Sequence, residues 1–103
     1  MIARVWHGAV PAAKSDDYLE YLTQTGVPGL SSTPGNCGVQ VLRRTKDDLA
    51  HFLLISLWDS PESIKTFAGG DIEKARYYPE DAQFLVEMEP AVIHYDVVVD
   101  NTP

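Results

Sequence analysis

Two histidines near strand ends are the side chains of this sequence best suited to exchange protons near neutral pH. His7 closes an apolar run at residues 2–8, and His94 lies early in the final apolar run at residues 91–99. An imidazole can act as a base or as a metal ligand. Each histidine could equally be a sheet residue that makes one hydrogen bond. Asp96 shares the face of His94 and could add a ligand, but we expect no metal.

Aromatic hydroxyl groups are the second candidates for chemistry. Tyr77 and Tyr78 stand side by side before Pro79. Their hydroxyls could donate hydrogen bonds to a phenol or quinone oxygen, or the rings could pack across a seam between two subunits. If the chain is an enzyme, we expect His7, Tyr77 and Tyr78 to be its catalytic residues.

Three further side chains are predicted to contact a substrate. Trp58 ends an apolar strand, where a tryptophan most often forms a wall of the core or of a cavity. Phe67 lies on a predicted helix and could belong to the core or to the cavity, and His94 completes the set. Cys37 has no cationic side chain near it in the sequence, so we expect an inert thiol.

The segment FLLISLWDSPESIKTF, residues 52–67, predicts a strand that turns directly into a helix. The apolar run at 52–57 is typical of a strand covered on both faces. Ser60 can cap a helix, Pro61 suits its first position, and Glu62 complements the positive end of its dipole. A small domain with a doubly covered sheet needs helices on one face and a partner on the other.

The remaining elements follow from periodicity and from the positions of glycine and proline. We expect a helix after Ser15 that ends at Gly26, then a long loop with a possible helical turn around residues 30–32. The predicted strands span residues 2–8, 39–44, 50–58 and 91–99, and the other predicted helical pieces span residues 61–68, 72–77 and 79–86.

This order predicts one α+β domain, residues 1–103, with the ferredoxin-like βαββαβ arrangement. Its crossovers place the helices on one face of a four-stranded antiparallel sheet. Neither the first nor the last strand has a cleanly polar face, so we expect a second copy to cover the other side and form a dimeric α/β barrel. If Ala3, Val5 and His7 face the helices, then Arg4 and Trp6 face the partner.

Composition excludes several function classes. The net charge is −7, from 15 acidic and 8 basic residues, so nucleic acids and anionic membranes are poor partners. One cysteine cannot form an intramolecular disulfide or a multi-thiolate zinc site. No secretory signal or membrane-spanning run is visible, and we expect a cytoplasmic protein.

The strand order, the segment LLISLWDSPESIKTF, the piece from Asp71 to Tyr78 and the final HYDVVV resemble the antibiotic biosynthesis monooxygenase superfamily. The resemblance covers nearly the whole chain. It implies a dimeric α+β barrel, and it includes cofactor-independent quinone-forming monooxygenases, haem-degrading monooxygenases and proteins without assigned substrates.

The two enzymatic branches imply different site residues. In the haem-degrading branch an asparagine, a tryptophan and a histidine carry the chemistry, and those positions fall here at His7, Phe67 and Tyr77, so none matches. In the quinone-forming branch an asparagine, a tryptophan and a tyrosine orient a phenolic substrate. Trp58, Tyr77 and Tyr78 match that set in part, and no asparagine lies in the strands.

We therefore expect a cofactor-independent monooxygenase that acts on a small aromatic or polyketide-like substrate. The alternatives are a non-catalytic dimer that binds a small apolar ligand, a haem-handling relative, or an isomerase on the same fold. The pocket is expected between the sheet and the helix at residues 61–68, with His7 pointing into it as a base and the segment from Gly69 to Pro79 closing its mouth.

Overall fold

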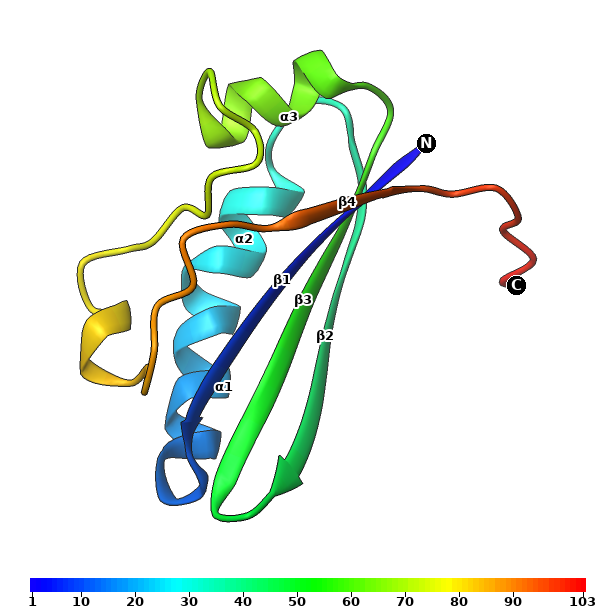
Figure 1. Ribbon diagram of the computed structural model, residues 1–103. Helices are drawn as coiled ribbons and strands as arrows, with labels where there is room; N and C mark the ends of the chain where they lie inside the picture. Colours follow the sequence, from blue (N-terminus) through cyan, green and yellow to red (C-terminus); the bar gives the residue numbers. More distant parts are fainter.

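The computed structural model describes residues 1–103 as a four-stranded antiparallel sheet in the order β2-β3-β1-β4, with the helices on one face (Figure 1). This confirms the predicted α+β, ferredoxin-like arrangement. No helix has the length and apolar character needed to cross a membrane. The elements are β1 (Ile2–Pro11), η1 (Ala12–Lys14), α1 (Ser15–Gln24), α2 (Gly26–Ser31), β2 (Asn36–Lys46), β3 (Leu49–Trp58), α3 (Pro61–Ala68), η2 (Asp81–Gln83) and β4 (Ile93–Asp96).

The two central strands alternate between a buried face and a half-exposed face, as a sheet covered on one side requires. On β1 the buried positions are Arg4, Trp6, Gly8 and Val10, and on β3 they are Ala50, Phe52, Ser56 and Trp58. These residues face the helices. The larger part of the core contains Trp6, Val10, Ala50 and Phe52 from these strands, with Tyr18, Leu22, Ala75, Leu85 and Val92, and Trp58 belongs to a smaller cluster with Leu30 and Ile64.

The alternation of β1 is the reverse of the one predicted. Arg4 and Trp6 face the helices, whereas Ala3, Val5 and His7 lie on the open face. Gly8 explains how Trp6 fits, because a Cβ atom at residue 8 would lie 2.3 Å from Cη2 of the Trp6 ring. The indole thus occupies the space that any other side chain at residue 8 would fill.

The helix boundaries follow local chemistry. Ser60 caps α3 by accepting a hydrogen bond from the Ser63 amide at 3.2 Å, with Pro61 at the first position, and the helix ends at Gly69. Residues 26–31, predicted mostly as loop, form α2 because Pro28 falls in the first turn of a new helix, where it is tolerated.

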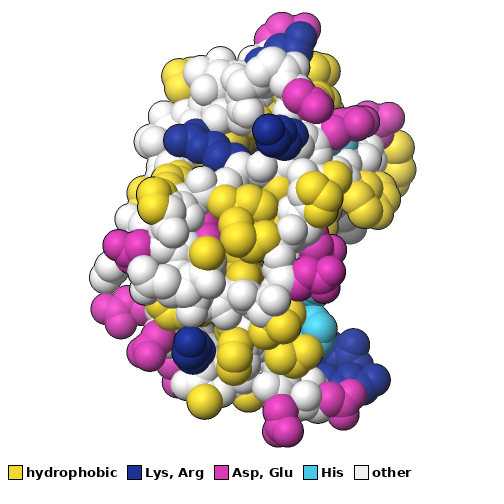
Figure 2. Space-filling model, turned by 60° about the vertical axis from the view of Figure 1, so that its left-hand side comes forward, with side chains coloured by type: hydrophobic (Ala, Val, Ile, Leu, Met, Phe, Trp, Pro, Cys, Tyr) yellow, Lys and Arg dark blue, Asp and Glu magenta, His cyan; other side chains and the backbone are white.

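The long connection between α3 and β4, residues 69–92, is mostly irregular. We predicted helical pieces at 72–77 and 79–86, but the structure contains only the 3-10 turn η2 at Asp81–Gln83. Gly69, Gly70, Pro79 and Pro90 interrupt the segment. Its backbone hydrogen bonds are scattered and mostly internal, as between Ala75 and Pro90, and the Val86 amide donates to the carbonyl of Ala9 on β1. Figure 2 shows hydrophobic side chains gathered in the middle of the side that carries this segment.

The open face of the sheet carries apolar side chains on all four strands, interrupted by polar ones such as His7, His51 and Gln40. Cross-strand pairing aligns Leu42 with Leu53, and Ile55 with Val5 and Ile93. Leu42 and Ile93 are exposed, as is Tyr95 in the next row. Exposed apolar side chains gathered on one face of a sheet are typical of an interaction surface.

Replacing Gly8 by Ala should lower the melting temperature, because the new methyl group would collide with Trp6 and lie 2.9 Å from Cδ2 of Leu85. Overpacking of this kind costs about 1–3 kcal/mol of unfolding free energy. Gly38→Ala on β2 is the matched control, since its Cβ would lie 3.7 Å from the nearest atom. Equal melting temperatures for the two variants would contradict this account of β1.

Candidate functional site

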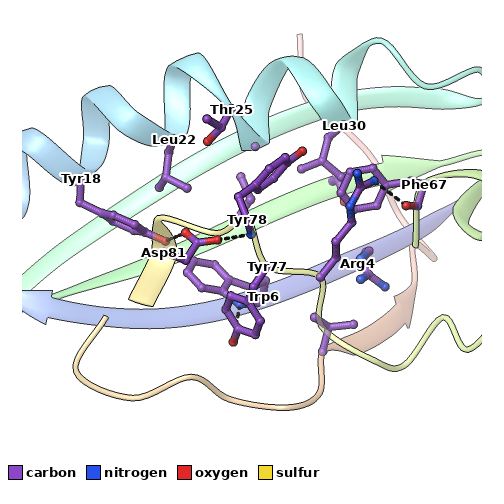
Figure 3. Close-up of a pocket in the computed structure, with 15 residues that line it drawn as sticks. Arg4, Trp6, Tyr18, Leu22, Thr25, Leu30, Phe67, Tyr77, Tyr78 and Asp81 are labelled. Atoms are coloured by element: carbon purple, nitrogen blue, oxygen red, sulfur yellow. Dashed lines mark hydrogen bonds between the residues drawn. The ribbon is translucent and has the colours of Figure 1, made fainter. Parts of the chain in front are cut away.

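A pocket lies between the buried face of the sheet, the α1–α2 helices and the irregular segment 69–92 (Figure 3). The pocket has a cavity volume of about 40 Å³. It is therefore narrow. The lining residues are Arg4, Trp6, Tyr18, Leu22, Thr25, Gly26, Leu30, Leu54, Ser56, Phe67, Arg76, Tyr77, Tyr78, Asp81 and Val92.

The predicted place of the pocket is correct in part. It lies on the helical side of the sheet, and residues of the segment from Gly69 to Pro79 line it as expected. It lies mainly beneath α1 and α2, however, and α3 contributes only Phe67. The short α3 ends at Ala68, so the adjacent irregular segment supplies that wall.

Two tyrosines and a tryptophan form the aromatic wall. The Trp6 indole donates from Nε1 to the Tyr77 hydroxyl at 3.2 Å, and that hydroxyl donates to the carbonyl of Glu89 at 2.5 Å. The two rings meet edge to face. The Tyr78 hydroxyl packs against the backbone of α2, 2.5 Å from where a Cβ atom at Gly29 would lie. The predicted pocket residues Tyr77 and Tyr78 thus face one cavity.

A buried carboxylate, which sequence reasoning missed, lies at the end of the pocket near Tyr18 (Figure 3). Asp81 is 5% exposed, and its carboxylate accepts hydrogen bonds from the Tyr18 hydroxyl at 3.2 Å and from the Tyr78 amide at 2.6 Å. Burial raises the pKa of Asp81 above its usual value, while the two hydrogen bonds oppose that shift. A carboxylate in this state can accept a proton from a bound phenol.

A buried guanidinium lies elsewhere in the same pocket. Arg4 is 4% exposed and donates to the carbonyls of Ile72 and Lys74, the latter at 3.2 Å. Burial lowers the pKa of Arg4 to about 10, so the group stays charged at neutral pH. The prediction placed Arg4 on the opposite face, which is why its role was missed.

The three residues predicted to bind substrate lie in different places. Phe67 lines the pocket. Trp58 does not, because it is fully buried against Leu30 and Ile64, where its indole donates to Ser56 Oγ at 2.8 Å. Its ring supports Phe67 from behind, with the ring centres 6.2 Å apart.

His94 also lies outside the pocket, although it reaches a pocket residue. Its Nε2 is 3.3 Å from a terminal nitrogen of Arg4, and the lowered pKa of His94, caused first by burial and then by the Arg4 charge, favours the neutral imidazole. A neutral Nε2 accepts the hydrogen bond from the guanidinium. His94 therefore supports Arg4 rather than facing a ligand in this cavity.

The prediction that His7 points into the pocket is wrong. His7 lies on the open face, with Nδ1 2.6 Å from Glu89 Oε2 and Nε2 3.0 Å from Nδ1 of His51. The two imidazoles stack with their centres 5.3 Å apart. Period-two alternation sends His7 to this face once Trp6 occupies the other. No group of three His, Cys, Asp or Glu side chains is arranged to hold a metal ion.

Replacing Tyr77 by Phe should destabilise the protein by about 1–3 kcal/mol, because the buried indole N–H of Trp6 then loses its acceptor. Chemical denaturation followed by circular dichroism measures the change. Tyr95→Phe is the control, since that side chain is 56% exposed. An unchanged midpoint for Tyr77→Phe would show that the indole finds water as a substitute.

Comparison with known proteins gives the family and the fold. Residues 1–76 match the family model for antibiotic biosynthesis monooxygenase, and no curated protein matches the sequence. Among solved structures, the heme-degrader MhuD of Mycobacterium tuberculosis, with two hemes bound in its active site, is 20% identical over 99% of this chain and 100% of that chain, with a TM-score of 0.66.

Two other solved structures are similar in fold. A proposed antibiotic biosynthesis monooxygenase from Nitrosomonas europaea has a TM-score of 0.69 at 16% identity, over 96% of this chain and 100% of that chain. One from Bacillus cereus has a TM-score of 0.66 at 17% identity, over 100% of this chain and 96% of that chain. The match of the family model over most of the sequence means that this chain belongs to the antibiotic biosynthesis monooxygenase family.

Proposed function

We propose that this protein is a cofactor-independent monooxygenase that oxidises a small phenolic aromatic molecule in the pocket between the sheet and the helices. The observation that carries the proposal is the combination of an aromatic wall with a buried carboxylate, Asp81, whose pKa is raised by burial. Deprotonating a phenol requires such a base in a dry site. Membership of the monooxygenase family supports the same reaction class.

The reaction requires only dioxygen and the substrate's own electrons. Asp81 takes the phenolic proton, and the resulting anion has carbanion character at a ring carbon. That carbon reduces dioxygen and forms a C–O bond to it, giving a peroxide. Loss of the ring hydrogen and cleavage of the O–O bond then release water. Phenol plus O₂ thus gives quinone plus H₂O, and each product receives one of the two oxygen atoms of O₂.

The other pocket residues would orient the substrate. Tyr77 is held by its hydrogen bonds to Trp6 and Glu89, so its ring is a fixed wall. Tyr78 lies beside Asp81, to which its amide donates, and its hydroxyl can meet a substrate oxygen. Asp81 takes the role that we predicted for His7, because His7 lies on the other face of the sheet.

Haem chemistry fits these residues poorly. Of the three histidines in the sequence, none lines the pocket, and the Tyr77 hydroxyl is already engaged by Trp6 and Glu89. We therefore propose that this chain does not degrade haem, although MhuD shares its fold. The remaining alternatives are a non-catalytic binder of an apolar ligand and an isomerase on the same fold.

We also propose that the chain acts as a homodimer formed through the open face of the sheet. The apolar rows that contain Leu42, Ile55 and Ile93 support this arrangement, because their burial against a second copy would remove them from water. The pocket lies on the opposite face, so each subunit would keep its own site.

Oxygen uptake with a panel of hydroxynaphthalenes tests the reaction. The wild-type protein should consume O₂ and form a quinone in the presence of a metal chelator, and Asp81→Asn should lower the rate by about 10²–10⁴-fold. The ionised carboxylate is the active form, so the wild-type rate should rise with pH through the raised pKa of Asp81. The rise in rate at acidic pH, which we call the acid limb of the profile, should be absent in Asp81→Asn.

Tyr18→Phe separates chemistry from folding. Its hydroxyl donates to Asp81 and lowers the pKa of that carboxylate, so its removal should move the acid limb to higher pH without abolishing turnover. Circular dichroism checks that each variant is folded. Oxygen uptake that is equal in wild type and Asp81→Asn would refute the role of Asp81, and tight binding without uptake by any phenol would favour the non-catalytic alternative.

One chain has a mass of 11.4 kDa, and light scattering behind a sizing column should give twice this mass for the wild type. Ile55→Glu places a charge in the middle of the apolar rows and should yield a folded monomer, since residue 55 is already half-exposed in one chain. Thr23→Glu, on the exposed side of α1, is the control that adds the same charge elsewhere. A monomeric wild type at micromolar concentration would exclude the proposed dimer.

A further inference from the structure

Two arginines, Arg4 and Arg76, line the same end of the pocket near Phe67. The guanidinium carbon of Arg76 lies 4.8 Å from the centre of the Phe67 ring, and that of Arg4 lies 5.9 Å from the same centre. Figure 3 shows Arg4 near Phe67, with Asp81 farther along the cavity beside Tyr18. The pocket therefore has a cationic end and an acidic end.

Neither arginine has a carboxylate partner. The ion pairs of the chain join His7 to Glu89 and Arg43 to Asp16. Arg4 donates to the carbonyls of Ile72 and Lys74 and to Nε2 of His94, all uncharged acceptors, and Arg76 donates to the carbonyl of Phe67 at 2.7 Å. Asp81, the one acidic residue of the lining, accepts from Tyr18 and Tyr78 instead.

For the buried Arg4 this absence of a carboxylate partner is unexpected in so acidic a chain, whereas Arg76 is exposed and its charge is solvated. The sequence carries 15 carboxylate side chains and a net charge of −7, so anions for local pairing are abundant. A buried cation without a counter-ion is costly, and proteins normally supply a partner. Arg4 keeps its charge at neutral pH because even its lowered pKa is about 10. An anionic ligand would provide the missing partner.

We propose that Arg4 and Arg76 form an anion-binding subsite, and that the pocket takes a hydroxylated aromatic carboxylate. The carboxylate would lie at the Phe67 end against the two guanidinium groups, which form charge-assisted hydrogen bonds with such groups. The ring would lie along Trp6 and Tyr78, and the phenolic oxygen would point toward Asp81. This names the substrate class of the proposed monooxygenase and rests on that function only for turnover.

A structural role explains part of the arrangement, and the test separates it from recognition. Arg4 fastens the segment containing Ile72 and Lys74 to β1, and Arg76 stacks on Phe67 and Tyr78. Those contacts would be needed with or without a ligand. A purely structural pair, however, would give no preference between an anionic ligand and its neutral counterpart of the same shape.

Titration calorimetry with a hydroxynaphthoate and with its carboxamide provides that comparison. The wild type should bind the acid on the order of tenfold more tightly than the amide. Arg76→Gln should remove most of this preference, and Arg76→Lys should retain part of it. Arg44→Gln, which removes the same charge from an exposed position of β2, should leave the preference unchanged.

Arg4→Lys is the second variant, because Arg4→Gln risks unfolding the segment that Arg4 holds. It should weaken acid binding more than amide binding. Equal binding of acid and amide by the wild type, or a preference that Arg76→Gln and Arg44→Gln change alike, would overturn the proposal. Protoporphyrin also carries carboxylates and is tested as a further ligand. If it binds in an Arg76-dependent way and the hydroxynaphthoate does not bind, the proposed ligand class of hydroxylated aromatic carboxylates is wrong.

The binding test and the oxygen-uptake test can each refute one proposal without refuting the other. Preferential binding of the acid without O₂ uptake would leave the subsite intact and refute the monooxygenase. O₂ uptake with neutral naphthols that equals uptake with the acid, together with equal affinity for acid and amide, would refute the subsite and leave the reaction intact.

Discussion

The hydrogen bonds from Arg4 to the carbonyls of Ile72 and Lys74 are the interaction on which the pocket depends. They join the middle of the sheet to a segment that has almost no regular structure of its own. Arg76, Tyr77 and Tyr78 follow directly after that point of attachment. A third contact, to His94 on β4, draws the last strand into the same junction. One guanidinium thus positions the wall of the pocket, and its charge gives that wall its chemical character.

The sequence predicted the fold because several local signals agreed with the global pattern. Ser60 and Pro61 marked the start of α3, the polar turn before Leu49 marked a hairpin, and the order of elements left one topology. The orientation of β1 could not be predicted in the same way. Both of its faces contain apolar residues, so alternation alone allows either. The choice is made by Gly8, whose missing side chain accommodates Trp6, and that packing involves residues distant in the sequence.

The candidate site was predicted only in part, for related reasons. Tyr77 and Tyr78 were found because two phenols before a proline are visible in the sequence. Asp81 lies in the piece 79–86 that was predicted as helical; in the structure it begins the short turn η2, and its carboxylate accepts a hydrogen bond from the amide of Tyr78. What was invisible is that α1 brings Tyr18 over the same carboxylate. Burial, which raises the pKa of Asp81, is a property of the tertiary structure and not of the turn.

The irregular segment 69–92 also has a consequence for how the molecule fluctuates. The strands share continuous rows of backbone hydrogen bonds, whereas this segment has scattered ones, such as Ala75 to Pro90 and Val92 to Glu73. Regions bonded in this way open at a lower free energy than the sheet, so their amides exchange with solvent deuterium sooner. The pocket is therefore bounded by a rigid floor and a side that can detach locally. A ligand larger than the closed cavity can enter when this segment opens locally, while the sheet stays folded.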